Sequence, residues 1–486
     1  MAYYIGIDLG TSAVKVLLLS ENRIEKTASR EYPLFFPKDG WSEQNPEDWY
    51  KQAIEALKEV LTDIDKSQVK SISFSGQMHG LVLLDEKDNV IRPAILWNDG
   101  RTDKETNYLN NVIGKDKLLE NTGNIAFAGF TAPKILWVKE NEPENFAKIC
   151  KIMLPKDYLS YMLTGNLCTD VSDASGTLYF DVGNRKWSQY MINILGIKEE
   201  MLPKVLESWE CAGTIKKDIA DELGLPEDVK VIIGAGDNAA AAVGTGTVKD
   251  GDCNISLGTS GTIFVVTDNF SYDRVNAIHS FCSASGNYHY MACMLSAASC
   301  CNWWIEKILG TKDYRSVEKV SDKLGENEVF WLPYLMGERS PLNDPYARAA
   351  FIGMSLATTK DEMSLAVLEG VAFALRQNLD IIRSLGVEVT ESRVSGGGSK
   401  DALWLRIIAS VLNIKLTVPV LQEGAALGAA LLAAKGVMDA DEYEALADKL
   451  TQKEKTVLPE PELVEKYNQK YETFLKIYPA IKTIGR

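Results

Sequence analysis

The chain has 486 residues, of which 46% are hydrophobic and 24% are charged. This composition is typical of a globular protein and argues against a disordered or fibrous chain, and the length suits about three domains or two lobes of roughly 240 residues. The 52 Lys and Arg residues against 67 Asp and Glu residues give a net charge of −15, which argues against nucleic acid or an anionic membrane as a partner.

The N-terminal residues predict a β-hairpin followed by a helix. Residues 3–8 and 13–19 are strand-like, and the small residues between them supply a tight turn. A helix is predicted over residues 46–61, with Asn45 as its N-cap and Pro46 at its first position.

Further along the chain, strand-like runs alternate with helical segments. The predicted strands cover residues 69–74, 229–233, 255–257 and 263–266. The predicted helices cover residues 365–382, 403–411 and 425–434, and a last helix begins near Pro461. This alternation indicates an α/β architecture.

One four-residue sequence, Leu-Gly-Thr-Ser, occurs twice. It covers residues 9–12 and returns at residues 257–260, an offset of 248 residues and about half of the chain. Four identical residues could be a coincidence, but both copies lie between strand-like segments. The repeat therefore favours two lobes of similar fold, each presenting one turn toward a shared cleft. The glycine-rich segment 244–251 is the predicted boundary, which gives domains of residues 1–246 and 247–486.

Both turns are suited to bind phosphate. Gly, Thr and Ser bring backbone N–H groups and hydroxyls close to a ligand because no bulky side chain intervenes. Asp8 precedes the first turn, where a carboxylate could hold Mg²⁺ beside the phosphates. An ordinary hairpin with an exposed Asp is the alternative for either turn alone, and the pair together favours phosphate binding. No G-x-x-x-x-G-K-[ST] sequence occurs, so a Walker-type phosphate loop is excluded.

The segment GAGDNAAAA (234–242) follows the predicted strand 229–233. A dinucleotide site of the Rossmann type is rejected, because Ala239 replaces the third glycine and Asp237 would repel a pyrophosphate. Two interpretations of Asp237 remain open. It could cap a helix over residues 239–243, or act as a general base at the carboxyl end of a strand, where α/β folds bind their ligands.

Two further glycine-containing segments carry polar groups. Gln77 and His79 follow the strand 69–74 and could hydrogen-bond a polyhydroxylated substrate, although a lone His is more often structural. The sequence SGGG (395–398) lies between a short strand and a helix, and it would permit close approach to a flat ligand such as adenine.

The eight cysteines suggest a reducing compartment. They are scattered, form no C-x-x-C sequence and do not resemble a disulfide framework. Four possible metal donors lie close together at His279, Cys282, His289 and Cys293, but the spacer of a zinc finger is absent, so packed strand residues are favoured over zinc. The N-terminus lacks the basic and apolar segments of a secretory signal, and we expect a cytoplasmic protein.

Together these motifs resemble the sugar-kinase family named for its FGGY sequence, within the class that shares the actin-like (ribonuclease H-like) ATPase fold. The similarity extends from Tyr4 to about Tyr478. It is carried by IGIDLGTS (5–12), WSEQNPEDW (41–49), GQMHG (76–80), RPAILWNDGR (92–101), GFTAPKILWV (129–138), LPKDYL (154–159), TDVSDASGT (169–177), GAGDNAAAAVG (234–244), SLGTSG (256–261), MLSAASC (294–300), LPYLMGER (332–339) and VLEGVAFAL (367–375). Within the family, GQMHG with WNDGR is similar to members that act on D-xylulose.

The resemblance implies a two-lobed α/β fold with an internally duplicated domain and an interlobe cleft. It implies transfer of the γ-phosphate of ATP to the 5-hydroxyl of D-xylulose, with a related ketopentose or polyol as the alternative acceptor. ATP and Mg²⁺ are the implied cofactors, and a small sugar is the implied partner, with neither nucleic acid nor a membrane. Members of the family are often dimeric, so a homodimer is one implied state. Chaperone nucleotidases and filament-forming relatives of actin share this fold, and an ATPase activity stimulated by sugar would separate the kinase from them.

Residue roles follow from the same resemblance. Asp237 matches the catalytic base that accepts the proton of the attacking sugar hydroxyl, and Asp8 matches the acidic residue that positions metal and phosphates. Met78 and His79 match the pair that contacts the sugar, and Asn238 borders the same pocket.

The nucleotide-binding residues are implied in the same way. Thr11 and Ser12, with Gly258 and Thr259, match the two phosphate turns, and Gly397 and Gly398 match the loop on the adenosine side. Two departures from the family pattern are Ser395 before the glycines and Ala241, where many relatives carry glycine.

Overall fold

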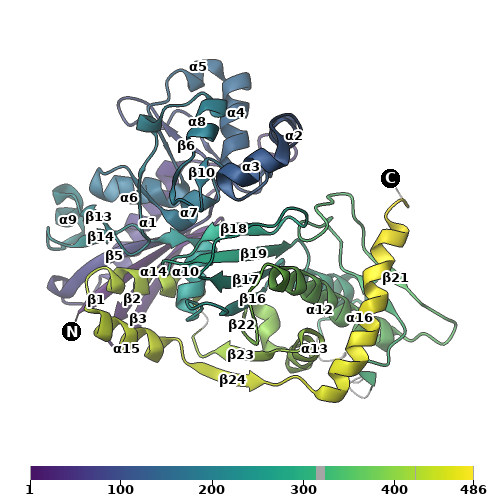
Figure 1. The fold of residues 1–486 in the computed structure, drawn as a ribbon. Coiled ribbons are helices and arrows are strands. Elements are labelled where there is room, and N and C mark those ends of the chain that lie inside the picture. Colours follow the sequence, from purple (N-terminus) through teal and green to yellow (C-terminus); the bar gives the residue numbers. More distant parts are fainter. Residues whose placement is uncertain (1, 314–322, 422, 485–486) are drawn as a thin grey trace.

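The computed structural model describes residues 2–313, 323–421 and 423–484 (Figure 1). Two seven-stranded sheets organise the chain. The first contains β1 (Tyr3–Leu9), β2 (Ala13–Ser20), β3 (Ile24–Glu31), β5 (Val69–Gly76), β13 (Cys211–Thr214), β14 (Lys230–Ile232) and β15 (Ala235–Gly236). The second contains β16 (Cys253–Leu257), β17 (Gly261–Thr267), β18 (His279–Cys282), β19 (Tyr288–Met294), β22 (Glu391–Ser395), β23 (Lys415–Pro419) and β24 (Lys453–Val457).

The two sheets share one topology. In the first sheet, β1 is antiparallel to β2 and parallel to β5, and β5 is parallel to β14. In the second sheet, β16 is antiparallel to β17 and parallel to β22, and β22 is parallel to β23. The two Leu-Gly-Thr-Ser turns therefore occupy the same place in each sheet, and the predicted duplicated α/β fold is confirmed.

A long insertion follows the first sheet's central strand β5 and forms a group of helices above that sheet in Figure 1. Its helices are α2 (Asp103–Asn107), η2 (Tyr108–Gly114), α3 (Lys115–Thr122), α4 (Thr131–Asn141), α5 (Pro143–Phe146), α6 (Pro155–Thr164), α7 (Val171–Ser175) and α8 (Gln189–Leu195). Short strand pairs join them, formed by β4 (Glu43–Gln44), β6 (Val82–Leu84), β7 (Ala94–Ile95), β8 (Lys151–Met153), β9 (Cys168–Asp170), β10 (Phe180–Asp181), β11 (Lys186–Trp187) and β12 (Lys204–Leu206).

The remaining helices cover the sheets. They are α1 (Pro46–Val60), α9 (Lys217–Leu223), α10 (Asp237–Gly244), α11 (Ala298–Asn302), α12 (Lys360–Ser384), α13 (Ala402–Leu412), α14 (Gly424–Lys435), α15 (Ala440–Leu450) and α16 (Pro461–Ile481). The short turns are η1 (Lys66–Gln68), η3 (Glu199–Met201), η4 (Trp303–Ile308) and η6 (Gly397–Lys400), and β20 (Phe330–Leu332) pairs with β21 (Ala350–Ile352). In the part of the chain that the structure describes, no helix is long and apolar enough to cross a bilayer.

The helix predicted over residues 46–61 is confirmed as α1, but its expected cap is wrong. Asn45 occupies the N-cap position with extended backbone, yet its side chain accepts no hydrogen bond from the first turn. Pro46 sets the helical φ, and the buried Trp49 fixes the first turn by donating its indole N–H to Gln44 at 3.0 Å. Packing therefore starts this helix without a side-chain cap.

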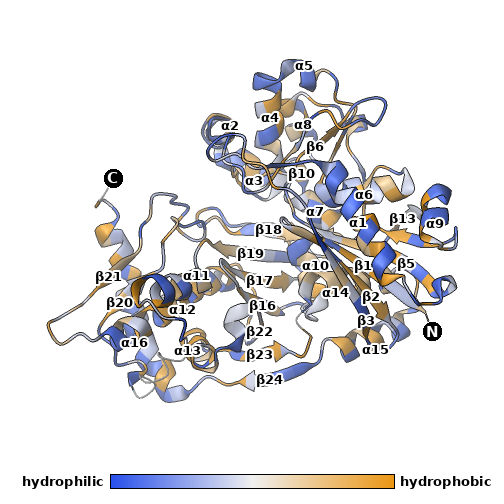
Figure 2. Cartoon of the chain, turned by 180° about the vertical axis from the view of Figure 1, so that it is seen from behind, coloured by the Kyte–Doolittle hydropathy of each residue, from blue (hydrophilic) through white to orange (hydrophobic). Residues whose placement is uncertain are grey.

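Helices α10 and α14 lie side by side between the two sheets (Figure 2). Their backbones approach so closely that a Cβ on Gly428 would lie 1.7 Å from the carbonyl oxygen of Ala240, and one on Gly244 would lie 2.0 Å from that of Gly424. On its other side, α14 contacts Gly6 of β1, where a Cβ would lie 2.3 Å from the oxygen of Ala426. Although α14 follows residue 247, it thus packs against the first sheet as well as against α10.

Candidate active site

The candidate site lies where three parallel strands end together. Asp8 of β1 is level with Ser75 of β5, and Ser75 is level with Ala235 of β15. One position later, Leu9, Gly76 and Gly236 form the next row. The predicted residues Met78 and His79 follow β5, and Asp237 and Asn238 begin α10. Parallel pairing therefore gathers Asp8, Met78, His79, Asp237 and Asn238 at one sheet edge.

Asp237 is the first residue of α10 and is not its N-cap, so the capping alternative is wrong. The N-cap is Gly236, which has no side chain with which to cap the helix. The Oδ1 atom of Asp237 accepts hydrogen bonds from the backbone N–H of Asn238 at 2.7 Å and from Asn238 Nδ2 at 2.8 Å. Both donors go to one oxygen, which leaves the second carboxylate oxygen for a substrate hydroxyl.

The pKa of the Asp237 carboxyl is raised to about 7, first by burial and then by the negative charge of Asp8, against the bonds from Asn238. A group with this pKa accepts a proton at neutral pH much more readily than an ordinary carboxylate does. Perturbation of this kind, at the carboxyl end of a strand, is typical of a catalytic residue.

Asp8 is the residue best placed to hold a cation. Its Oδ1 accepts a hydrogen bond from Ser75 Oγ at 2.9 Å, and burial raises the pKa of its carboxyl despite that bond and the charge of Lys15. Among the described residues, no three His, Cys, Asp or Glu side chains gather as a metal cage. Mg²⁺ needs no such cage, since one or two carboxylates with substrate phosphates hold it in many enzymes. The negative charge of Asp8 raises the pKa of Asp237, so the two carboxyls act on one site. A site with two carboxyls suits a divalent cation, and Asp8 fits the Mg²⁺ that the family resemblance implies.

His79 adopts a left-handed backbone with φ of +68°, which is uncommon for a residue other than glycine. Lys134 Nζ and Thr131 Oγ1 both donate to its carbonyl oxygen, at 2.8 and 3.1 Å. Its Nδ1 lies 2.7 Å from the carbonyl oxygen of Gly176, so Nδ1 carries the proton, and its ring stacks on Phe130. Surrounding contacts thus hold a strained residue in one orientation.

The His79 imidazole is neutral. Burial lowers its pKa to about 3, with smaller contributions from the charges of Lys134 and Arg339 and against the bond to Gly176. With the proton fixed on Nδ1, Nε2 can only accept a hydrogen bond, as from a sugar hydroxyl.

Two glycines make room for Met78 and His79. A Cβ on Gly176 would lie 2.4 Å from His79 Cε1, and one on Gly236 would lie 2.9 Å from Met78 Sδ. Met78 is buried. The Met78–His79 pair is therefore wedged between the start of α10 and the end of α7.

The first Leu-Gly-Thr-Ser turn is held by side chains that donate hydrogen bonds to it. Tyr32 donates its hydroxyl to the carbonyl oxygen of Gly10, and Gln44 Nε2 donates to that of Thr11 at 2.7 Å. The indole N–H of Trp97 donates to Thr11 Oγ1 at 2.9 Å, while Ser12 is exposed. These bonds hold the turn in place, and the Ser12 side chain is left exposed.

The second turn is held in a related way. The N–H groups of Ala298 and Ala297 donate to the carbonyl oxygens of Gly258 and Thr259, at 2.9 and 3.0 Å. The Thr259 side chain is exposed.

The loop assigned to adenosine lies directly beside the second turn. Ser395 of β22 is level with Ser256 of β16, and Gly396, with φ of +84°, passes against the backbone of Leu257. Gly397 is exposed, and a Cβ added to it would have no atom within 4 Å, whereas Gly398 packs against Trp404. An open glycine at this edge would admit a flat ring.

Comparison with known proteins decides the family. The N-terminal domain model of the FGGY family of carbohydrate kinases matches residues 3–244, and the C-terminal domain model of that family matches residues 253–437. The chain belongs to the FGGY family of carbohydrate kinases. It is a phosphotransferase with an alcohol acceptor that uses ATP.

The relatives of this kinase match it along its whole length. The chain is similar to the xylulose kinase of Escherichia coli, at 39% identity over 98% of this chain and 99% of that protein. Its structure is similar to that of a ligand-bound xylulose kinase from Lactobacillus acidophilus, with a TM-score of 0.94, 26% identity and coverage of 100% and 99%. A gluconate kinase from the same organism matches with a TM-score of 0.93, 26% identity and coverage of 99% of each chain.

The structure brings the charge of Arg339, a residue that the sequence patterns did not single out, within range of His79. The guanidinium of Arg339 lies 5.6 Å from the ring centroid of Phe127 and contacts the thiol of Cys293. Its positive charge contributes to the lowered pKa of His79. Within the described residues it forms no ion pair with a carboxylate. The charge of Asp237 also acts on Cys293, so Cys293 and Arg339 both lie within electrostatic range of the strand-end cluster. The available signal in the sequence was the charged pair Glu338–Arg339 directly after Gly337 in LPYLMGER.

The two histidines among the four possible metal donors of β18 and β19 pack against aromatic rings. His279 stacks on Phe281 with centroids 5.3 Å apart, and His289 stacks on Phe264 at 4.0 Å. Burial lowers the pKa of both imidazoles. Both histidines are therefore neutral core residues of the kinase.

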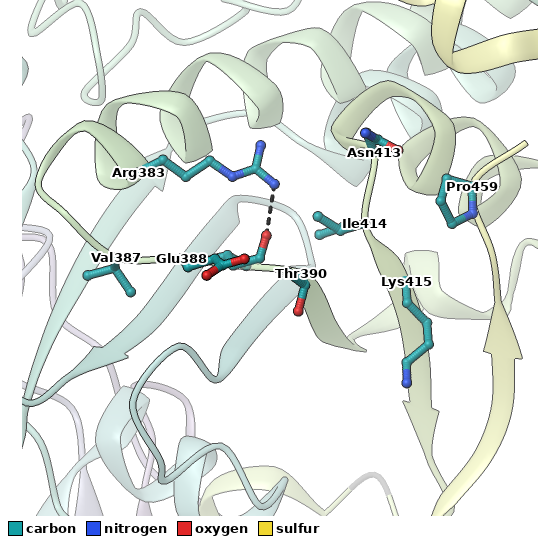
Figure 3. A pocket seen from close by; sticks show the side chains of 9 residues that line it. Arg383, Val387, Glu388, Thr390, Asn413, Ile414, Lys415 and Pro459 are labelled. Atoms are coloured by element: carbon teal, nitrogen blue, oxygen red, sulfur yellow. Dashed lines mark hydrogen bonds between the residues drawn. The ribbon is translucent and has the colours of Figure 1, made fainter. Parts of the chain in front are cut away.

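A surface pocket of the kinase lies away from this chemistry. Figure 3 shows it beside the residues that precede β22 and β23, lined by Arg383, Glu388, Thr390, Asn413 and Lys415. These residues lie at the amino ends of strands whose carboxyl ends lead toward the adenosine loop. Arg383 is already bonded to the carbonyl oxygen of Val389 at 2.9 Å. Nothing here resembles a reactive centre.

Proposed function

We propose that the kinase transfers the γ-phosphate of ATP to the 5-hydroxyl of D-xylulose, giving D-xylulose 5-phosphate and ADP. The observation that carries the proposal is the strand-end cluster of Asp8, Met78, His79, Asp237 and Asn238, in a chain whose full-length relatives include xylulose kinases.

Asp237 acts as the general base in this proposal. The carboxylate oxygen of Asp237 that Asn238 does not bind accepts the proton of the sugar 5-hydroxyl, while the oxygen of that hydroxyl attacks the γ-phosphorus. Asn238 holds Oδ1 of Asp237 in place. Phosphoryl transfer passes through a loose transition state, so the protein mainly positions the reactants in line. A base of this kind contributes about 10²–10⁴-fold.

The ketose is held by Met78, His79 and Arg339. Nε2 of His79 accepts from one sugar hydroxyl, and the guanidinium of Arg339 donates to sugar oxygens from the second lobe. Backbone amides and hydroxyls of the turns at residues 10–12 and 258–260 bind phosphate oxygens. Asp8 would hold Mg²⁺, which when bound would neutralise charge on the phosphate oxygens.

A second candidate acceptor is an aldonate such as gluconate. A gluconate kinase has nearly the same structure, and the guanidinium of Arg339 could bind a carboxylate. The two candidate acceptors are tested by measuring the release of ADP by the purified protein with ATP and Mg²⁺. The acceptors compared are D-xylulose, D-ribulose, L-ribulose, D-gluconate, glycerol and none. Selective release with D-xylulose supports the proposal, and selective release with gluconate replaces it.

His79→Asn is expected to raise KM for the sugar by about tenfold or more while KM for ATP changes less than about twofold. Asn tolerates the left-handed backbone of His79 better than Ala does, so the variant isolates the lost imidazole acceptor. Initial rates over a matrix of sugar and ATP concentrations measure both constants. Equal changes in the two would place His79 outside the sugar pocket.

Arg339→Met is expected to raise KM for the sugar by about tenfold or more, because donors to its oxygens are lost while side-chain bulk is retained. Arg348→Met is the matched control, since Arg348 lies on the same loop, is exposed and contacts the carbonyl oxygens of Pro345 and Ala347. The same kinetic matrix serves both variants. An unchanged sugar KM in Arg339→Met would remove Arg339 from the site.

A further inference from the structure

A charged cluster lies fully buried behind the candidate site. Lys156 Nζ is 2.7 Å from Asp157 Oδ1, 2.9 Å from Asp170 Oδ1 and 3.7 Å from Asp173 Oδ2, and all four side chains have 0% exposure. The cluster comes from LPKDYL and TDVSDASGT, two segments that the proposed mechanism does not use.

One cation faces three carboxyl groups in this cluster. Burial alone would lower the pKa of Lys156, but Asp157, Asp170 and Asp173 raise it, so the ammonium stays charged. Burial raises the pKa values of Asp157 and Asp173. Replacing buried ions by apolar groups is often neutral or stabilising, so stability alone does not account for such a cluster.

A chain of hydrogen bonds joins the cluster to the backbone beside Asp237. Asp170 Oδ2 accepts from the backbone N–H of Ser172 at 2.8 Å and from the hydroxyls of Ser172 and Ser208. Because the Ser172 hydroxyl proton goes to Asp170, its oxygen is left as an acceptor, and Gly236 N–H donates to it at 3.1 Å. The Gly236 peptide leads directly into Asp237.

Lys156 also packs against the neighbouring strand. A Cβ on Gly76, the last residue of β5, would lie 2.8 Å from Lys156 Cβ. Gly76 and Gly236 are level in the sheet. The cluster and Ser172 therefore contact the ends of the two strands that lead into the candidate site.

We propose that Ser172, oriented by Asp170 and Lys156, is a positioning residue that fixes the Gly236–Asp237 backbone and thereby aims the Asp237 carboxylate at the sugar hydroxyl. This inference rests on the proposed role of Asp237. Ser172 touches no reactant and acts only through the peptide that it anchors. Small misplacements of a reacting group can cost as much as about 100-fold in rate.

Ser172→Ala tests the proposal, with Ser208→Ala as its matched control. Both hydroxyls are fully buried and donate to Asp170 Oδ2, but only Ser172 accepts from Gly236. Ser172→Ala is expected to lower kcat by about tenfold or more, with KM for sugar and for ATP within about twofold. Ser208→Ala is expected to keep kcat within about twofold of wild type, although its loss of thermal stability should be similar to that of Ser172→Ala.

Equal kcat losses in the two variants, or an unchanged kcat in Ser172→Ala, would overturn the proposal. If Ser172→Ala does not fold, Ser172→Cys serves instead, since a thiol of similar size is a weaker acceptor and should give a smaller loss of kcat. Full kcat in the folded Ser172→Cys protein would equally count against a positioning role.

A double-mutant cycle separates this inference from the proposed function. If Ser172 acts through Asp237, Ser172→Ala should add no further loss of kcat to an Asp237→Asn protein. A full tenfold loss in that background would overturn the positioning role alone. Near-normal kcat in Asp237→Asn by itself would instead refute the proposed mechanism.

Discussion

Asp237→Asn is expected to lower kcat by about two to four orders of magnitude while sugar and ATP still bind. Asn keeps the shape of the side chain and can still face Asn238, but it cannot take the proton of the sugar hydroxyl. Steady-state kinetics give kcat, and calorimetric titration of ATP and sugar gives the two dissociation constants. Turnover within about threefold of wild type would remove Asp237 from the mechanism.

The same substitution should change stability with pH. Burial and the charge of Asp8 raise the Asp237 pKa from 3.8 to about 7. Between those pH values the folded state retains a proton that the unfolded state has released, so the carboxyl lowers the free energy of unfolding as pH rises. Asn removes that effect. In protein free of ligand and Mg²⁺, Asp237→Asn should therefore melt at least about 2 °C above wild type at about pH 8.

The difference in melting temperature should shrink at about pH 5, where more of Asp237 is protonated in the folded state. Asp228→Asn is a suitable control, because this carboxyl is exposed and precedes β14, away from the strand ends of the candidate site. A pH-independent difference, or a variant that melts below wild type at pH 8, would contradict the raised pKa. Loss of activity with a gain in stability is the pattern expected of a group kept for chemistry.

The sequence predicted the parts of the site that depend on local pattern. Asp8 and the start of GDNAA each follow a run of strand residues, and parallel strands place their carboxyl ends at one edge. The repeated turn predicted the duplicated topology, because its two copies lie between corresponding strands. These features need only a strand, a turn and a few small polar residues in order.

Features that arise from distant contacts were not predictable in this way. Nothing local to Ser172 indicates that its hydroxyl accepts from Gly236, 64 residues later. Arg339 and His79 come together only once the lobes are assembled. The interpretation of Asp237 as a helix cap failed for a different, local reason. Residue-type preference does not tell an N-cap from the first helical residue, and α10 begins one residue after β15 ends.

Gly428→Ala is expected to lower the melting temperature by at least about 5 °C, although Ala has the better helix propensity by about 1 kcal/mol. The added Cβ would lie 1.7 Å from the oxygen and 2.5 Å from the carbon of the Ala240 carbonyl, which is backbone and cannot rotate away. Moving α14 would also strain its contact with Gly6 of β1, so overpacking here should cost about 3 kcal/mol or more.

The position of this contact makes Gly428 important for activity as well as for stability. Because α10 begins with Asp237, displacing α10 from α14 should move the Asp237 carboxylate. If Asp237 is the base, as proposed, kcat should then fall in the protein that remains folded. Differential scanning fluorimetry and initial rates measure the two effects. Gly100→Ala is the control, since the nearest atom would lie 3.5 Å from its Cβ and the residue is exposed. Equal melting temperatures for the two variants would mean that α10 and α14 separate freely, contrary to the packing described.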